Sequence, residues 1–115
     1  MKTEYLNKIT DLLGRVRPRL SKTHELSFKS CFGAVAGYVD GNIFISCGRF
    51  GTALKLPAEA VSSLLEEKGV KRLKYFPNGH VKKDYAVLPR RILQDQRRMK
   101  TLIRQSIRFA VTEER

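Results

Sequence analysis

The chain has 115 residues, of which 42% are hydrophobic and 30% are charged, and its formal net charge is +12. This balance is typical of one globular domain and excludes a mainly disordered chain. No run of about 18 apolar residues occurs, which excludes a transmembrane helix, and Glu4 and Asp11 interrupt the apolar pattern that a secretory signal needs. We therefore expect a single cytoplasmic domain over residues 1–115, without a second domain and without a membrane partner.

The N-terminal segment predicts an amphipathic helix over residues 3–16. Its apolar residues recur at helical spacing, namely Tyr5, Leu6, Ile9, Leu12, Leu13 and Val16. Pro18 should end this helix near Arg17, because proline disfavours the helical conformation of the residue before it.

A strand that contains glycines is predicted next. Asp40-Gly41 follows it and is a strong hairpin signal. Gly48 and Gly51 enclose a second turn, so we expect a three-strand meander over residues 28–39, 43–45 and 52–56. The glycines of the first strand indicate either close packing of another element or the approach of a ligand to the backbone, and both readings stay open here.

A helix over residues 57–68 should follow the meander. Pro57 fits the first position of this helix, where a backbone N–H would have no hydrogen-bond acceptor, and Gly69 is a favourable C-terminal cap. A second hairpin is then expected, with strands over 72–76 and 81–87 around the turn Pro77-Asn78-Gly79.

The chain ends in a long helix. Pro89 starts a short helical turn before it, and Asp95 is expected to cap it. One side of the helix is apolar, with Met99, Leu102, Ile103, Ile107, Ala110 and Val111. Together the elements predict an α+β fold: an antiparallel sheet of about five strands (meander, helix, hairpin) packed with the N-terminal and C-terminal helices.

Two cysteines, Cys31 and Cys47, stand on either side of the first hairpin turn. The turn places Cys47 opposite residues 34–36, roughly 10–17 Å along the strand from Cys31. Since a disulfide needs Cα atoms within about 7 Å, we expect two reduced, buried thiols.

Catalytic chemistry has no recognisable pattern in the chain. The two histidines, His24 and His80, belong to no ligand spacing for a metal, and a strand follows the phosphate-loop-like glycines Gly48 and Gly51 where a helix would be needed. We therefore expect no enzyme activity, no cofactor, and neither catalytic nor metal-binding residues.

The final helix concentrates positive charge. Arg97, Lys100, Arg104 and Arg108 recur at steps of three, four and four, and Arg98 lies beside them. These five residues are the candidate nucleic-acid contacts, since cations on one helix can meet phosphates. No helix-turn-helix pair accompanies them, so only weakly sequence-specific binding is indicated. A solvated surface or an acidic partner explains the same charge, and packing on the sheet explains the apolar side better than a membrane does.

A series of turn and strand motifs extends from Phe32 to Pro89. It consists of Phe32-Gly33, Gly37-Tyr38-x-Asp40-Gly41, Ile43-Phe44, the strand from Gly51 to Leu56, the helix up to Gly69, and Asp84-Tyr85-x-Val87-x-Pro89. This series resembles the N-terminal domain of TfoX/Sxy proteins, bacterial regulators of competence for DNA uptake. Three features depart from the family pattern: Ala53 stands where an aromatic residue is common, Asp84-Tyr85 stands where the family usually has Tyr-Tyr, and Leu88 is an extra residue before the last proline.

The resemblance implies a noncatalytic regulatory or protein-interaction domain that modulates transcription through a partner in the transcription machinery, such as the cyclic-AMP receptor protein. Full-length family regulators carry a second, helical domain, which we do not expect within residues 1–115. Direct nucleic-acid binding by the final helix is the alternative. The resemblance supplies no ligand-binding residues. Phe50, at a turn tip, is either a core residue or an exposed contact, so the oligomeric state stays open.

Overall fold

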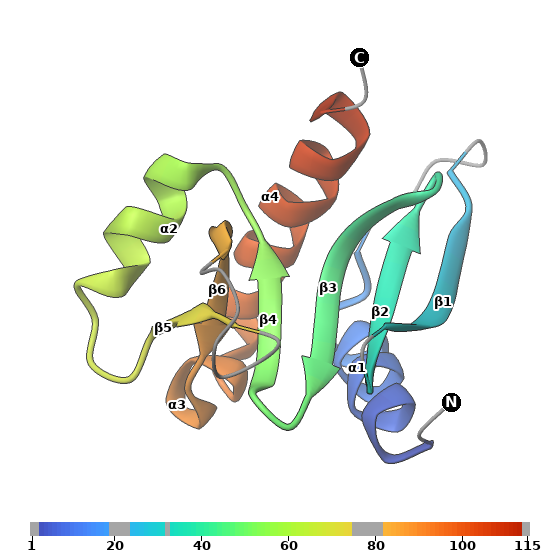
Figure 1. The fold of residues 1–115 in the computed structure, drawn as a ribbon, viewed down its shortest axis with the longest axis horizontal. Coiled ribbons are helices and arrows are strands. Elements are labelled where there is room, and N and C mark those ends of the chain that lie inside the picture. Colours follow the sequence, from blue (N-terminus) through green and yellow to red (C-terminus); the bar gives the residue numbers. More distant parts are fainter. Residues whose placement is uncertain (1–2, 19–23, 32, 75–81, 114–115) are drawn as a thin grey trace.

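An antiparallel sheet forms the centre of the fold (Figure 1). The computed structural model describes residues 3–18, 24–31, 33–74 and 82–113. In this part of the chain the sheet has six strands, in the order β1 (Leu26–Cys31), β2 (Ala34–Val39), β3 (Asn42–Gly48), β4 (Gly51–Lys55), β6 (Lys82–Leu88) and β5 (Lys71–Leu73). The helices are α1 (Thr3–Val16), α2 (Ala58–Leu65), α3 (Arg90–Leu93) and α4 (Gln96–Glu113). The α+β fold with an N-terminal and a C-terminal helix is therefore confirmed.

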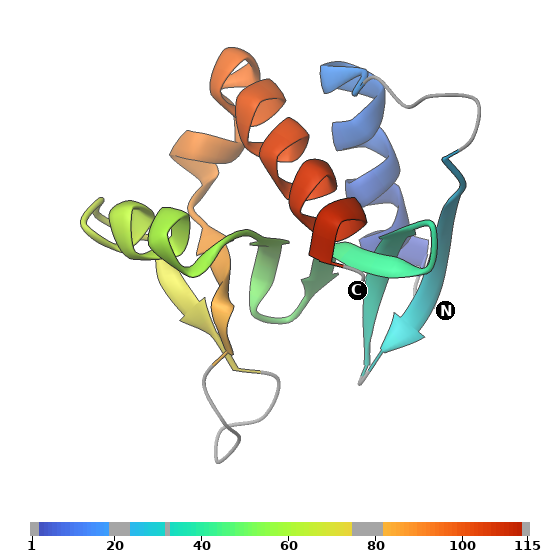
Figure 2. The same ribbon diagram turned by 90° about the horizontal axis from the view of Figure 1, so that it is seen from above.

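Helices α1 and α4 lie side by side over one face of the sheet, as Figure 2 shows from above, and α2 packs near β6. The main core lies between these helices and that face. Its fully buried side chains include Ile9, Val35, Phe44, Leu54, Leu56, Met99 and Ile103. The apolar sides that the sequence predicted for both terminal helices are the sides that the core buries, because an amphipathic helix on a sheet is stable only in that orientation.

A smaller apolar cluster lies on the opposite face of the sheet. It contains Ala53, Leu73, Tyr85 and Val87. Ala53, Tyr85 and Val87 alternate along their strands with Leu54, Ala86 and Leu88 of the main core. Phe50 is half-buried against this cluster, so it contributes to packing within the chain.

The sixth strand arises because the segment over 28–39 is two strands. Gly33 has φ +79°, a conformation that allows the chain to reverse, and Cys31 then pairs with Ala34 across an antiparallel ladder. Sequence reasoning read both strands as one, since both are apolar and the reversal contains a single glycine. The other meander turns are confirmed: Asp40 and Gly41 both have positive φ, as a type I′ hairpin requires, and Gly48 pairs with Gly51.

The later elements match with small shifts. Helix α2 ends at Leu65, three residues before the predicted end, because the chain tightens into turns closed by Glu66 and Glu67 before Gly69 at φ +90°. Asp95 caps α4 as expected, with its Oδ1 accepting from the Arg98 amide at 3.1 Å. The turn Pro77-Asn78-Gly79 and His80 lie outside the described residues.

Cys47 is a buried free thiol and its Cα lies opposite Val35, as predicted. The side chain of Cys31 lies outside the described part of the structure. Gly37 decides between the two readings of the strand glycines in favour of packing. A Cβ there would lie 2.7 Å from Cγ2 of Ile45, so the position admits no side chain without movement of its neighbours.

Candidate functional site

A positively charged hollow of the described surface lies along α4. Its lining residues are Arg17, Pro18, His24, Lys100, Arg104, Ile107, Arg108 and Val111, and its volume is about 650 Å³. We call this hollow the basic groove. Helix α4 supplies three exposed cations at four-residue steps, Lys100, Arg104 and Arg108, which we call the cation row. Because four residues are close to one helical turn, these three side chains leave the same side of α4.

The C-terminal end of α1 forms another part of the groove lining. Arg17 follows the last helical residue at φ +47°, and its amide donates to the Leu13 carbonyl at 2.9 Å, which is the hydrogen bond of a left-handed helix cap. Nε2 of Gln96 donates to the Arg15 carbonyl at 3.0 Å. This contact joins the end of α1 to the start of α4, and so holds Arg17 beside the cation row.

His24 completes the lining and is held from the hairpin turn Asp40-Gly41 between β2 and β3. Its Nδ1 lies 2.6 Å from Oδ2 of Asp40, while Oδ1 of Asp40 accepts from the Glu25 amide at 2.7 Å. The Glu25 amide, and next the hydrogen bond from His24, lower the pKa of Asp40 below its ordinary value. Asp40 is therefore a carboxylate at neutral pH whose two oxygens are already engaged by His24 and Glu25, rather than by the cation row.

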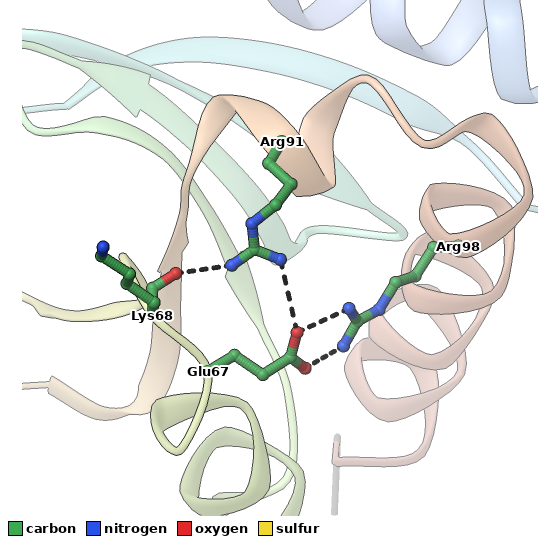
Figure 3. A network of polar contacts seen from close by, with 4 residues as sticks. All are labelled: Glu67, Lys68, Arg91 and Arg98. Carbon is green, nitrogen blue, oxygen red and sulfur yellow. Dashed lines mark hydrogen bonds and ion pairs between the residues drawn. The ribbon is translucent and has the colours of Figure 1, made fainter.

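Arg98 has a structural role that separates it from the cation row. Its guanidinium forms two hydrogen bonds with the carboxylate of Glu67, one of them at 2.7 Å (Figure 3). Arg91 lies 3.7 Å from the same carboxylate and donates to the Lys68 carbonyl at 2.6 Å. The hydrogen bonds from Arg98 lower the pKa of Glu67. A planar pairing of this kind joins the turn after α2 to the start of α4.

The five residues predicted from the sequence thus divide into two groups. Lys100, Arg104 and Arg108 lie together in the basic groove. Arg97 and Arg98 instead line a smaller hollow of about 300 Å³ at the start of α4. Sequence reasoning did not include two groove residues, Arg17 and His24. Nothing in a helical repeat could have indicated them, because both precede the sheet and reach α4 only through tertiary packing.

Comparison with known families identifies the family of the chain. The family model described as the TfoX N-terminal domain matches residues 19–110. The chain belongs to the TfoX N-terminal domain family. No curated protein and no solved structure matches it significantly.

In this TfoX N-terminal domain the family match includes part of the groove. His24, the cation row and Ile107 lie within residues 19–110, whereas Arg17, Pro18 and Val111 lie outside them. The groove is therefore built partly from the shared domain and partly from residues flanking it.

The described residues favour electrostatic binding over metal or thiol chemistry. Within residues 3–18, 24–31, 33–74 and 82–113, no three His, Cys, Asp or Glu side chains are placed to hold a metal ion. Burial raises the pKa of the Cys47 thiol, which disfavours the reactive thiolate. None of the helices in this part of the chain is both long and apolar enough to span a membrane. What the groove offers a ligand is a set of cations beside apolar side chains.

Proposed function

We propose that this TfoX N-terminal domain is a noncatalytic regulatory domain that modulates transcription by docking on a protein partner of the transcription machinery. The observation that carries the proposal is the cation row: Lys100, Arg104 and Arg108 are exposed, and no acid of the described residues pairs with them. Family membership supports a role of the competence-regulator type. Exposed charges of one sign guide association with a partner of the opposite sign.

The test measures transcription in the native host. Cells that express the wild-type domain should show altered transcript levels, and a Lys100→Glu/Arg104→Glu/Arg108→Glu variant should lose most of that change while its melting temperature stays within a few degrees. Arg97→Glu is the matched control, because it makes the same kind of charge change on the same helix outside the groove. Transcript levels that do not respond to the wild-type domain would contradict the proposal.

Direct nucleic-acid binding is the second candidate. It is favoured by the four-cation set Arg97, Lys100, Arg104 and Arg108, which lies along one helix and has no acid partner among the described residues. If all four meet phosphates of duplex DNA, log affinity should fall with log salt at a slope near −3.6. Fluorescence anisotropy with the wild type and a variant carrying glutamate at all four positions measures this slope. Submicromolar affinity at physiological salt that the variant loses would favour this candidate over the protein partner.

A further inference from the structure

The cation row has a spacing that limits what can bind along it. Successive members are four residues apart, which is about 6 Å along a helix axis, so the row spans about 12 Å. In an extended peptide, alternate side chains point to the same side and lie about 6.6 Å apart. Three carboxylates at alternate positions of an extended segment therefore come within hydrogen-bonding reach of Lys100, Arg104 and Arg108 together.

No acidic side chain is among the described residues that line the groove. Arg17, which follows α1, contributes a fourth cation, and His24 is a further lining residue. The carboxylate nearest to His24 is Asp40, which already accepts from His24 and from the Glu25 amide. Among the described residues no acid neutralises these cations, so a negatively charged ligand fits the basic groove.

The apolar part of the groove lining favours a peptide over a nucleic acid as the ligand. Val111 and Pro18 line the groove at half-buried positions, whereas Ile107, one helical turn before Val111, belongs to the core and is only 7% exposed. The sugar–phosphate backbone of duplex DNA carries no flexible alkyl side chain next to its phosphates, whereas a peptide can carry an apolar residue next to its acids. Burial of that residue adds a favourable contribution that salt does not screen.

We propose that the basic groove binds a short acidic segment of a protein partner in extended conformation. Carboxylates at alternate positions face the cation row and Arg17, and one apolar side chain of the segment lies on Val111. This inference rests on the proposed function, since the segment belongs to the regulatory partner. It adds the chemistry and the spacing that the partner must have.

The experiment uses the full chain and two labelled ten-residue peptides. One peptide has glutamate at alternate positions, serine between them and a single leucine; the other has the same composition with its glutamates adjacent. Fluorescence anisotropy should give tighter binding for the alternating peptide, by about fivefold or more, because only its spacing follows the cation row. Equal affinity for the two peptides would overturn the extended, spaced mode of binding.

Matched variants test whether the groove itself is the site. Arg104→Glu and Arg17→Glu should each weaken the alternating peptide about tenfold, whereas Arg97→Glu should change its affinity by less than about threefold. Val111→Ser, at a half-buried position, should weaken it at high salt as well as at low salt. An equal loss from Arg97→Glu and Arg104→Glu would mean a diffuse charge effect and would overturn the site.

Two further outcomes separate this inference from the proposed function. If the triple variant of the cation row loses the transcriptional effect but the alternating peptide does not bind, the inference fails and the proposed function stands. If the peptide binds with the expected variant pattern but the host transcripts do not respond, the inference stands and the proposed function fails. Competition by duplex DNA at equal charge concentration, with loss of the Val111→Ser effect, would assign the groove to nucleic acid instead.

Discussion

The hydroxyl of Ser106 donates a 2.6 Å hydrogen bond to the main-chain carbonyl of Phe44, which joins α4 to β3 across 62 residues of sequence. The register of β2 and β3 shifts at this point: Gly37 pairs with Ile45 and Tyr38 with Ile43, so Phe44 is the extra residue of a bulge. Both Phe44 and Ser106 are fully buried. The hydrogen bond thus satisfies a strand carbonyl at the bulge and sets which side of α4 faces the sheet, and therefore which side carries the cation row into solvent.

Replacing Ser106 by alanine should destabilise the domain by about 1–3 kcal/mol, because the buried carbonyl of Phe44 loses its partner. Urea unfolding followed by circular dichroism measures this change in the free energy of unfolding. Thr101→Ala is the control on the same helix: its hydroxyl contacts the Arg97 carbonyl at an exposed position, so the change should be within about 0.5 kcal/mol. Similar losses of unfolding free energy for both variants would mean that the hydrogen bond to Phe44 does not stabilise the domain more than an exposed one.

Alanine substitutions at two glycines should change the stability of the domain in opposite directions. At Gly37 the new Cβ would lie 2.7 Å from Ile45 Cγ2 and 3.3 Å from a ring carbon of Phe44, so Gly37→Ala should cost about 1–3 kcal/mol of stability. At Gly14, an exposed position of α1, no atom lies within 4 Å, and Gly14→Ala should stabilise by about 0.5–1 kcal/mol. Thermal melts of the two variants beside the wild type check both signs. A tolerated alanine at Gly37 would show that the close approach is not required.

Glu67 should contribute more to stability than its neighbour Glu66. Glu67→Gln removes the negative charge that pairs with Arg98 and Arg91. It should lower the free energy of unfolding by about 1 kcal/mol at low salt, and by less at high salt, since the ion pairs are partly exposed. Glu66→Gln alters an exposed carboxylate without a described ion pair and serves as the matched control. Urea midpoints at two salt concentrations measure the difference. If the loss is the same for both variants, Glu67 does not join α2 to α4 in solution.

The stabilising contacts of Asp40 should depend on pH in the acid range. Its pKa in the folded state lies below the ordinary value of 3.8, because the Glu25 amide and His24 hydrogen-bond the carboxylate. The contribution to stability is therefore complete only well above the ordinary pKa of 3.8 and is lost as the pH falls through the folded-state pKa. Asp40→Asn should lower the melting temperature at pH 7, and the difference from the wild type should shrink below pH 4. A difference that stays constant from pH 7 to pH 2.5 would contradict this account.

Local patterns predicted most of the elements, because their causes are local. Both terminal helices follow from apolar spacing, and the hairpin at Asp40-Gly41 follows from residues that tolerate positive φ. The reversal at Gly33 was missed, since one glycine between two apolar runs also fits a continuous strand. The early end of α2 was missed as well, because its last turns are closed by backbone hydrogen bonds of Glu66 and Glu67 that no residue preference signals.

The sequence by itself determined the fold class, the family and the presence of a cationic side on the last helix. Only the tertiary structure decided which cations share a site. Arg98 is held by Glu67, 31 residues away, and Arg17 reaches the cation row because Gln96 binds the end of α1, 81 residues away. A helical repeat reports neighbours three or four residues apart, whereas the acid that pairs with one arginine, or the helix end that brings in another, comes from a distant segment. The packing of α1 and α4 on the sheet brings these distant residues together and thereby forms the basic groove.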